Sequence, residues 1–378
     1  MSINLTIPRD LLPSDGRFGA GPSKVRSSQV ETILAHNTAK ARQLIVGTSH
    51  RQAPVKDLVH EIRNMLAELF SLPDGYEIVL GNGGATAFWA VAATSLIRHR
   101  SAHATFGEFG QKFYDEAARA PHLATPVEFH AAPGSLAVVT AAEGVDAYAW
   151  PHHETSTGVV SPVNRVSDNA LMLVDATSIA GGIEIDISQT DAYYFAPQKC
   201  FGSDGGLWFA LLSPAAQERA RELHTDQNRW MPQILDLSIA LDNSQKNQTL
   251  NTPALMTLLS LHDQLRWMLS IGGLKASAQR SRTSSNLVYQ WAESHQYATP
   301  FVSDPLQRSP VVATIDFEGV KASDIASVLR ANGIVDVEPY RKLGRNQLRI
   351  AVFPSVDPAD VEKLLAAIDW VIDALGGA

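Results

Sequence analysis

The fold is decided by the stretch YEIVLGNGGATAFWAVAATSLI, residues 76–97. Its first part, residues 76–80, is short and mostly apolar, as expected of a strand. The glycines that follow predict a tight turn, and the alanine-rich residues 85–97 predict a buried helix. Strand, glycine turn and helix in this order open a β-α-β unit.

Outward from this stretch the same alternation continues. Apolar side chains recur at helical spacing over residues 55–70, which predicts an amphipathic helix. The run LMLV at residues 171–174 is continuously apolar, as in strands that are buried on both faces. Further short strands are predicted at residues 136–139, 147–150, 192–196 and 207–212. Together these elements predict an α/β fold with a parallel or mixed sheet between layers of helices.

The two ends of the chain differ from this middle part. Residues 1–20 are irregular and are expected to form an arm that lies against another surface, such as a second subunit. A long amphipathic stretch, residues 253–295, is expected to bridge to a second unit. That unit is predicted to contain strands and helices at residues 311–317, 323–332, 348–353 and 358–375. The expected organisation is an arm (1–20), a large α/β domain (21–262) and a small C-terminal α+β domain (263–378).

Composition excludes several classes of protein. The 378 residues carry 31 basic and 39 acidic side chains, a formal charge of −8, which gives no general attraction to nucleic acid. No apolar run approaches the ~20 residues of a membrane span, and the first residues lack the segments of a signal peptide. The single cysteine, Cys200, excludes an intrachain disulfide and a multi-cysteine metal site. We therefore expect a cytoplasmic enzyme of small molecules, with no membrane or nucleic-acid partner.

The glycine turn is the first feature that could carry chemistry. Glycines allow backbone N–H groups to approach an anion, and the dipole of the following helix favours negative charge. The turn could therefore hold a phosphate, together with the hydroxyl of Thr86. A tight turn without any ligand explains the same glycines. The spacing matches neither the dinucleotide motif G-x-G-x-x-G nor the phosphate loop that ends in G-K-[ST], which disfavours both kinds of nucleotide.

Asp175 and Lys199 are the second and third features. Asp175 follows the buried run at 171–174, and ligands of open α/β sheets bind beyond the carboxyl ends of the strands. Its alternative role is to cap a helix or a turn. Lys199 follows the strand predicted at 192–196, and desolvation lowers the pKa of a lysine and makes it nucleophilic. Its alternative is a surface lysine on a loop.

One ligand accounts for all three features. A phosphate turn, an aspartate at a strand end and a lysine 24 positions later (199 − 175) describe a site for pyridoxal 5′-phosphate. The cofactor's phosphate would lie on the helix that begins at Ala85. Asp175 would keep the pyridine nitrogen protonated, and Lys199 would hold the aldehyde.

The sequence also resembles a known family over nearly its whole length. The motifs that carry the resemblance are FGAGPS (18–23), TSHR (48–51), GG (83–84), ET (154–155), Asp175, QK (198–199), NTP (251–253) and GRNQLRI (344–350). The chain resembles the phosphoserine aminotransferases, which are class V, fold-type I pyridoxal-phosphate enzymes. The resemblance implies a large domain with a mixed, mostly parallel sheet flanked by helices, and a smaller C-terminal α+β domain.

The resemblance implies a role for each residue of the cofactor site. These residues are Ala85, Thr86, Phe109, Thr155, Asp175, Gln198 and Lys199, with Asn251 and Thr252 from the neighbouring subunit of a homodimer. Lys199 would be the catalytic residue, which forms the Schiff base and shuttles a proton. Thr155 would bind the ring hydroxyl, and Gln198 the phosphate. Phe109 stands where relatives usually stack a tryptophan on the ring, and Ala85 stands where many relatives carry arginine.

The resemblance also implies the substrates. Glutamate and 3-phosphohydroxypyruvate would give 2-oxoglutarate and O-phosphoserine, in serine biosynthesis. Each substrate carries an α-carboxylate and a second anionic group, and guanidinium groups bind such anions bidentately. Arg349 is the candidate for the α-carboxylate, and His50, Arg51 and Arg341 are candidates for the second anion. A solvated basic loop is the alternative interpretation of the arginines at 341 and 349.

Two other functions compete with this interpretation. Another class V aminotransferase, such as an alanine–glyoxylate or serine–glyoxylate enzyme, has little use for His50 and Arg51 as a second anion clamp. A non-catalytic regulator with the same fold would not need Lys199, Asp175 and Arg349 together.

Two groups of residues receive structural interpretations. Residues 152–154, His-His-Glu, look like a metal cluster, but adjacent side chains point in different directions, and no metal is expected. The tryptophans at positions 89, 208, 267 and 370 lie in apolar patterns and are expected to be core residues.

Overall fold

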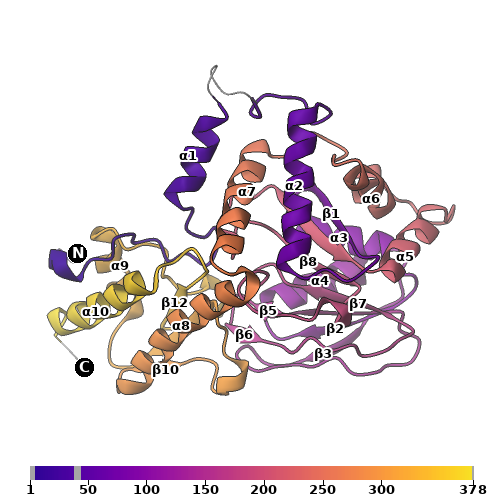
Figure 1. Ribbon diagram of the computed structural model, residues 1–378. Helices are drawn as coiled ribbons and strands as arrows, with labels where there is room; N and C mark the ends of the chain where they lie inside the picture. The colour runs from indigo at the N-terminus through magenta and orange to yellow at the C-terminus, as the bar shows by residue number, and fades with distance from the viewer. Residues whose placement is uncertain (1–4, 38–43, 377–378) are drawn as a thin grey trace.

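The computed structural model describes residues 5–37 and 44–376, and in this part of the chain the largest sheet has seven strands (Figure 1). Their order across the sheet is β1-β9-β8-β7-β4-β2-β3. The strands are β1 (Glu77–Asn82), β2 (Ser101–Thr105), β3 (Val127–His130), β4 (Ala147–Pro151), β7 (Leu171–Asp175), β8 (Ala192–Phe195) and β9 (Leu207–Leu212). The sheet is mixed, as the sequence predicts, because β9 runs antiparallel to both of its neighbours.

The direction of the strands brings several strand ends to one edge. β8, β7, β4, β2 and β3 are parallel to one another. β1 has the same direction as β8, because both are antiparallel to β9. The carboxyl ends of β1, β4, β7 and β8 therefore lie along the same edge of the sheet, which is where ligands bind in folds of this kind.

Helices cover both faces of this sheet, and alternate side chains of each strand point to opposite faces. On β7, Met172 and Val174 join the core formed with α2 (Ala53–Leu69) and α7 (Leu255–Ser270). Leu171 and Leu173 join the core on the other face. The helices of that face are α3 (Ala85–Ser95), α4 (Glu108–Arg119), α5 (Pro214–His224) and α6 (Leu237–Gln245). The remaining helix of the N-terminal half, α1 (Ser27–Ala35), contacts α7.

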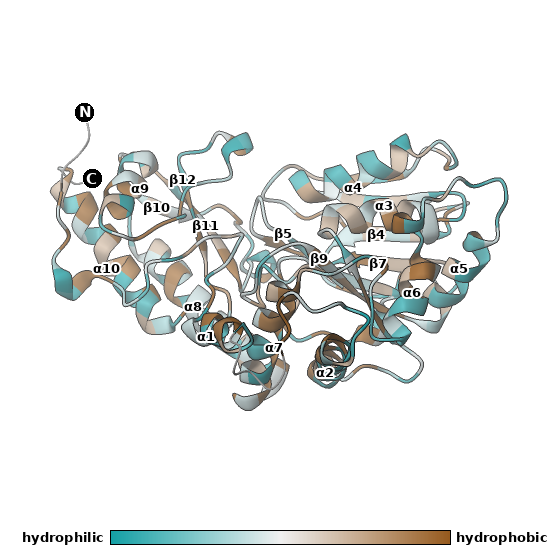
Figure 2. Ribbon diagram, turned by 90° about the horizontal axis from the view of Figure 1, so that it is seen from above, coloured by the Kyte–Doolittle hydropathy of each residue, from teal (hydrophilic) through white to brown (hydrophobic). Residues whose placement is uncertain are grey.

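The C-terminal part forms a second unit beside the large sheet (Figure 2). Its strands are β10 (Ala298–Pro300), β11 (Val312–Phe317) and β12 (Gln347–Ala351), and its helices are α8 (Gly273–Ser294), α9 (Ala322–Ala331) and α10 (Pro358–Ala374). The described part of the N-terminal arm, residues 5–20, lies on this unit, and residues 1–4 of the predicted arm lie outside the described residues. Ile7 and Phe18 are buried in its core, and the Ser14 N–H donates to Asp360 Oδ1 at 2.7 Å. The surface expected to hold the arm thus belongs to the same chain.

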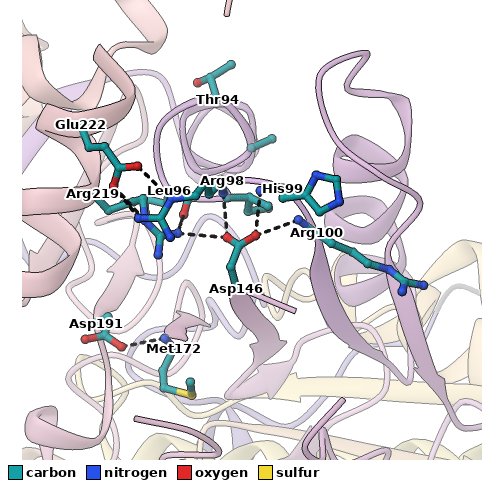
Figure 3. Close-up of polar contacts among 12 residues, drawn as sticks. Thr94, Leu96, Arg98, His99, Arg100, Asp146, Met172, Asp191, Arg219 and Glu222 are labelled. Carbon is teal, nitrogen blue, oxygen red and sulfur yellow. Dashed lines mark hydrogen bonds and ion pairs between the residues drawn. The ribbon is translucent and has the colours of Figure 1, made fainter. Parts of the chain in front are cut away.

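At the opposite edge of the sheet, the carboxylate of Asp146 binds the segments that precede two strands (Figure 3). Its carboxylate accepts hydrogen bonds from the backbone N–H groups of Arg98, His99 and Arg100, at 2.7–2.8 Å. It also accepts one from Arg219 Nη1 on α5, at 3.0 Å. Because Asp146 directly precedes β4 and residues 98–100 directly precede β2, this single carboxylate fixes the starts of two neighbouring strands against α5.

Most predicted elements lie within a few residues of their observed bounds, and three points differ. Residues 136–139 form no strand in the described chain, although Ala137 and Val139 are buried against the core. The stretch 253–295 is two helices, α7 and α8, because the chain turns at Gly272, which has a positive φ of 116°. The sequence did not reveal several elements, namely the strands β2, β3, β5 (His153–Glu154), β6 (Val159–Val160) and β10 and the helices α1, α4, α5 and α6. The expected domain boundary at residue 262 lies inside α7, and the division into domains stays a prediction.

No described helix is long and apolar enough to cross a membrane.

Candidate active site

A cavity of about 190 Å³ lies at the edge where β1, β4, β7 and β8 end. Among the residues that line it are seven that the sequence assigned to a cofactor: Ala85, Thr86, Phe109, Thr155, Asp175, Gln198 and Lys199. The others are Gly84, Trp89, His153, Thr177 and Ser178. Residues from five separate segments of the chain therefore meet at one place.

Lys199 lies in the loop between β8 and β9, and its amine points at the N-terminal segment. Lys199 Nζ donates a hydrogen bond to the carbonyl oxygen of Ala20 at 2.6 Å. Gly21 leaves the space that the amine occupies, since a Cβ at this position would lie 1.9 Å from Nζ. Burial and the positive charge of Arg349 lower the pKa of Lys199 to about 8. A useful fraction of this amine is therefore unprotonated near neutral pH.

Asp175 ends β7, and both of its carboxylate oxygens are held by N–H donors. Oδ1 accepts from the backbone of Thr177 at 2.9 Å, and Oδ2 accepts from the indole of Trp89 at 2.9 Å. Burial raises the pKa of Asp175, while these hydrogen bonds oppose the rise. Asp175 thus caps the turn after β7 through Oδ1 and is at the same time a fixed carboxylate in the cavity wall.

The β-hairpin of β5 (His153–Glu154) and β6 (Val159–Val160) presents Thr155 in its turn. Thr155 Oγ1 donates to Ser178 Oγ at 2.6 Å, so the hairpin is joined to the loop after β7. Glu154 is fully buried, and its Oε2 accepts from the backbone N–H groups of Phe109 and Gly110 at 2.9 and 3.0 Å. The buried carboxylate therefore fixes the start of α4, and with it the ring of Phe109 at the cavity.

The first turn of α3 offers donors for an anion. The N–H groups at a helix start have no intrahelical acceptor, and those of Ala87 and Phe88 already donate to the oxygen of Gly84. The groups of Ala85 and Thr86 remain, next to the Thr86 hydroxyl, and the helix dipole favours negative charge there. Gln198 also lines the cavity, and of its two amide atoms only Nε2 can donate to an anion, because Oε1, which is buried without a partner within the described residues, is an acceptor.

Arg349 lies beside the cavity, and the other predicted substrate residues are not among the residues that line it. Arg349 Nη1 donates to the oxygen of Thr155 at 3.3 Å, and its guanidinium lies 5.4 Å from the ring centre of Tyr340. Arg341 is exposed in a short 3-10 turn and does not line the cavity. The neighbouring basic residues are engaged elsewhere, since Lys342 pairs with Glu108 and Arg345 pairs with Asp316.

His50, Arg51, Asn251 and Thr252 form a separate group. Thr252 Oγ1 and His50 Nδ1 are 3.2 Å apart, and the backbone carbonyl oxygen of Thr252 accepts a hydrogen bond from Asn82 Nδ2 at 3.0 Å. Arg51 and Asn251 are exposed. None of these four residues lines the cavity of its own chain, as far as the described residues show.

Comparison with known proteins identifies the family. The profile of the class-V aminotransferases matches residues 139–336. The phosphoserine aminotransferase of a Nocardioides species is 57% identical, covering 99% of this chain and 100% of its own. That of Rhodococcus jostii is 54% identical, covering 98% of each chain. The chain belongs to the phosphoserine aminotransferase family.

Solved structures agree at the level of the fold. A phosphoserine aminotransferase from Cytophaga hutchinsonii has a TM-score of 0.87 at 23% identity, covering 94% of this chain and 99% of its own. An alanine–glyoxylate aminotransferase from a Nostoc species has a TM-score of 0.77 at 21% identity, covering 98% of this chain and all of its own. At such identities the likeness shows the fold, which is that of fold-type I aminotransferases.

The cavity of this family member fits pyridoxal 5′-phosphate. Buried polar atoms that have no partner within the described chain include Thr177 Oγ1, Gln198 Oε1 and His153 Nε2, and all three residues line the cavity. Such groups are rare unless a ligand satisfies them. The cofactor brings a phosphate, a ring hydroxyl and a basic ring nitrogen, which match the donors on α3, Thr155 and the carboxylate of Asp175.

Trp89 is the cavity residue whose function the sequence did not reveal. It is 3% exposed and packs in the core, as its apolar pattern predicts, but it also lines the cavity and bonds to Asp175. His152 and His153 each have one ring nitrogen near a neighbouring hydroxyl, since His152 Nδ1 lies 3.1 Å from Tyr193 Oη and His153 Nδ1 lies 2.7 Å from Ser178 Oγ, whereas His153 Nε2 has no partner within the described residues.

Proposed function

We propose that the protein transfers the amino group of glutamate to 3-phosphohydroxypyruvate, giving O-phosphoserine and 2-oxoglutarate, as a step of serine biosynthesis. The observation that carries the proposal is the meeting of Lys199, Asp175 and Thr155 in one cavity. Relatives at 54–57% identity over nearly the whole chain are named phosphoserine aminotransferases, which supports the choice of substrates. The cytoplasmic location expected from the sequence stays a prediction.

Pyridoxal phosphate, when bound, supplies an electron sink for the carbon that carries the amino group. Lys199 Nζ is the group that takes and returns the proton, because its pKa of about 8 lies near the working pH. Asp175 holds a proton at the ring nitrogen, and Thr155 orients the ring hydroxyl. The N–H groups of Ala85 and Thr86 bind the phosphate, together with Gln198.

Arg349 is proposed to bind the α-carboxylate of both substrates. Its guanidinium lies beside the cavity, next to Thr155, and Nε is buried without a partner among the described residues. A planar donor pair of this kind matches a carboxylate. Arg341 remains a candidate for the second anion only if its exposed turn moves toward the cavity.

The active enzyme is proposed to be a homodimer in which each subunit completes the site of the other. Asn251 and Thr252 lie outside the cavity of their own chain, and the contact between Thr252 and His50 places the two predicted anion-binding segments together. His50, Arg51, Asn251 and Thr252 would therefore reach the partner's cavity as one unit. Asn251 and Thr252 would bind the cofactor's phosphate, and His50 and Arg51 the second anion of the substrate.

Mixing an inactive variant, Lys199→Ala, with an impaired one, Arg51→Ala, tests this arrangement when activity is measured with 3-phosphohydroxypyruvate. Lys199→Ala retains Arg51, and Arg51→Ala retains Lys199. If Arg51 serves the partner's site, dimers that contain one chain of each kind have one complete site, and activity is restored after unfolding and refolding the mixture. If Arg51 serves its own chain, every site in the mixture lacks one of the two residues, and the activity of the mixture does not exceed that of the Arg51→Ala variant.

The absorbance spectrum of the purified holoenzyme tests the reaction itself. Glutamate is expected to remove the visible band of the bound cofactor, and 3-phosphohydroxypyruvate is expected to restore it. Loss of the band without restoration would keep an aminotransferase and exclude the phosphorylated substrate. Restoration by glyoxylate instead would favour an alanine–glyoxylate type of enzyme. A protein that binds no pyridoxal phosphate would refute the proposal.

A further inference from the structure

Trp89 lines the cavity from helix α3, and it contacts Asp175, which ends strand β7. It lies in the second turn of α3, five residues after Gly84, and its side chain is 3% exposed. The indole ring packs almost parallel to Phe113 of α4, with ring centres 6.3 Å apart. Its Nε1 donates to Asp175 Oδ2 on β7 at 2.9 Å. The same side chain therefore packs in the core through its ring and binds the carboxylate through its N–H.

Asp175 depends on such donors because it has no cationic partner. Among the described residues it takes part in no ion pair, and its two fixed hydrogen bonds come from the Trp89 indole and the Thr177 backbone. A buried carboxylate keeps its charge only if hydrogen bonds replace its lost hydration. One donor on each oxygen also sets the plane of the carboxylate, which leaves the remaining lone pairs for the cavity that Asp175 lines.

The other groups around Asp175 do not replace the indole. Tyr194 lies opposite Asp175 on β8, and its hydroxyl, like that of Thr177, is close enough to lower the pKa of Asp175, but neither hydroxyl makes a well-aligned hydrogen bond in the described chain. Lys199 acts on Asp175 through its charge, and its amine is bonded to Ala20. Tyr193, the residue before Tyr194 on β8, has its hydroxyl 3.1 Å from His152 Nδ1.

We propose that Trp89 is a positioning residue for Asp175, which holds the carboxylate ionised and oriented so that the proton of the Asp175–pyridine pair stays on the ring nitrogen. This inference rests on the proposed function, because it requires pyridoxal phosphate in the cavity. Removing the indole N–H makes Asp175 more basic. The shared proton then moves toward the carboxyl oxygen, and the cofactor loses both its charge and part of its affinity.

The test uses the holoenzyme with pyridoxal phosphate labelled with ¹⁵N in the ring, whose chemical shift distinguishes a protonated from an unprotonated nitrogen. Trp89→Phe keeps an aromatic ring and removes the N–H. We expect its ¹⁵N shift to move toward that of neutral pyridine and its dissociation constant for the cofactor to rise about ten-fold or more, as expected for loss of a hydrogen bond to a charged group.

Trp291→Phe is the matched control. Trp291 is also buried and also donates its indole N–H to a carboxylate, Asp369 Oδ1, at 2.8 Å, but it lies in the C-terminal unit. We expect this variant to keep the ¹⁵N shift and the cofactor affinity of the wild type. If Trp89→Phe does not fold, β-(3-benzothienyl)alanine at position 89 keeps the bicyclic shape, replaces N–H by sulfur, and is expected to give the same shift.

The outcomes separate this inference from the proposed function. A wild type with a protonated ring nitrogen and a Trp89 variant with the same shift and affinity would overturn the role of Trp89 alone. Equal changes in the Trp89 and Trp291 variants would also overturn it, since the effect would then be general. A wild type that binds no pyridoxal phosphate would overturn the proposed function, and the inference with it.

Discussion

Gly21→Ala is expected to move the reactive amine while leaving the fold intact. A Cβ at position 21 would lie 1.9 Å from Lys199 Nζ and 2.8 Å from Cε. Such contacts do not come closer than 3.0 Å, so the amine must shift by about 1.1 Å (3.0 − 1.9). The obstructing atoms are the end of a flexible side chain, which can swing away. The hydrogen bond from Nζ to the Ala20 oxygen is then lost.

Gly21→Ala should therefore lower the reaction rate more strongly than it lowers the free energy of unfolding. A displacement of about 1 Å at a reacting group can lower the rate by about 100-fold. The φ of Gly21 is 147°, and placing a side chain there costs about 1–3 kcal/mol of folding free energy. We expect the rate of the glutamate half-reaction, measured by stopped-flow absorbance, to fall by about 100-fold.

Gly144→Ala provides the control. Gly144 also has a positive φ, 69°, but a Cβ there would meet no atom within 4 Å. This variant should lose stability without losing rate. A Gly21→Ala enzyme that keeps the wild-type half-reaction rate, or a Gly144→Ala enzyme that is slowed as much, would refute the reasoning.

Four further changes test other parts of the site and the fold. Lys199→Ala should bind pyridoxal phosphate without a covalent bond and lose turnover by several orders of magnitude; full transamination would remove Lys199 from the mechanism. The apoprotein captures the cofactor through the unprotonated amine of Lys199, so the rate of capture should rise with pH and level off above about 8. A rate that continues to rise to pH 10 would contradict the lowered pKa of Lys199. Arg51→Ala should lower kcat/KM for 3-phosphohydroxypyruvate by about 10- to 100-fold while sparing a keto acid without phosphate, and equal losses would make Arg51 structural. Asp146→Ala should lower the free energy of unfolding in urea by about 3 kcal/mol, because Arg219 and three backbone N–H groups lose their acceptor. The control is Asp242→Ala, which removes an exposed ion pair with Arg221 and should lower the free energy of unfolding by less than about 1 kcal/mol.

The sequence predicted most of the sheet and three features of the cavity, the glycine turn before α3, Asp175 and Lys199, for a physical reason, whereas the other cavity residues followed from the family resemblance. Strands buried on both faces are continuous apolar runs, so β7, β8 and β9 were recognisable, and the residues just past β7 and β8 had to lie at one edge. Residues 136–139 show the limit of this signal. Their apolar side chains pack against the core, but a strand also requires a neighbour with free N–H and C=O groups, which a run of residues does not reveal.

The residues that sequence could not assign are those whose function depends on a partner from another element. Trp89 sits in an apolar helix pattern, and nothing in that pattern separates a core ring from a ring with an N–H aimed at a carboxylate. Glu154 belongs to a recognised motif, yet its role as an acceptor for the start of α4 follows only from the position of Phe109 and Gly110. His50 and Thr252 are 202 positions apart, and their contact is visible only in the fold.

The strand order explains how such distant residues act as one site. β7 and β8 are parallel neighbours, so Asp175 at the end of one and Lys199 beyond the end of the other face the same cavity. β1 shares their direction only because β9 is inserted antiparallel between β1 and β8, and this brings the start of α3 to the same edge. The reversal of β9 is therefore a functional feature: with β9 parallel to β8, an antiparallel β1 would carry Ala85 and Thr86 to the opposite edge, and the phosphate donors would be separated from the amine.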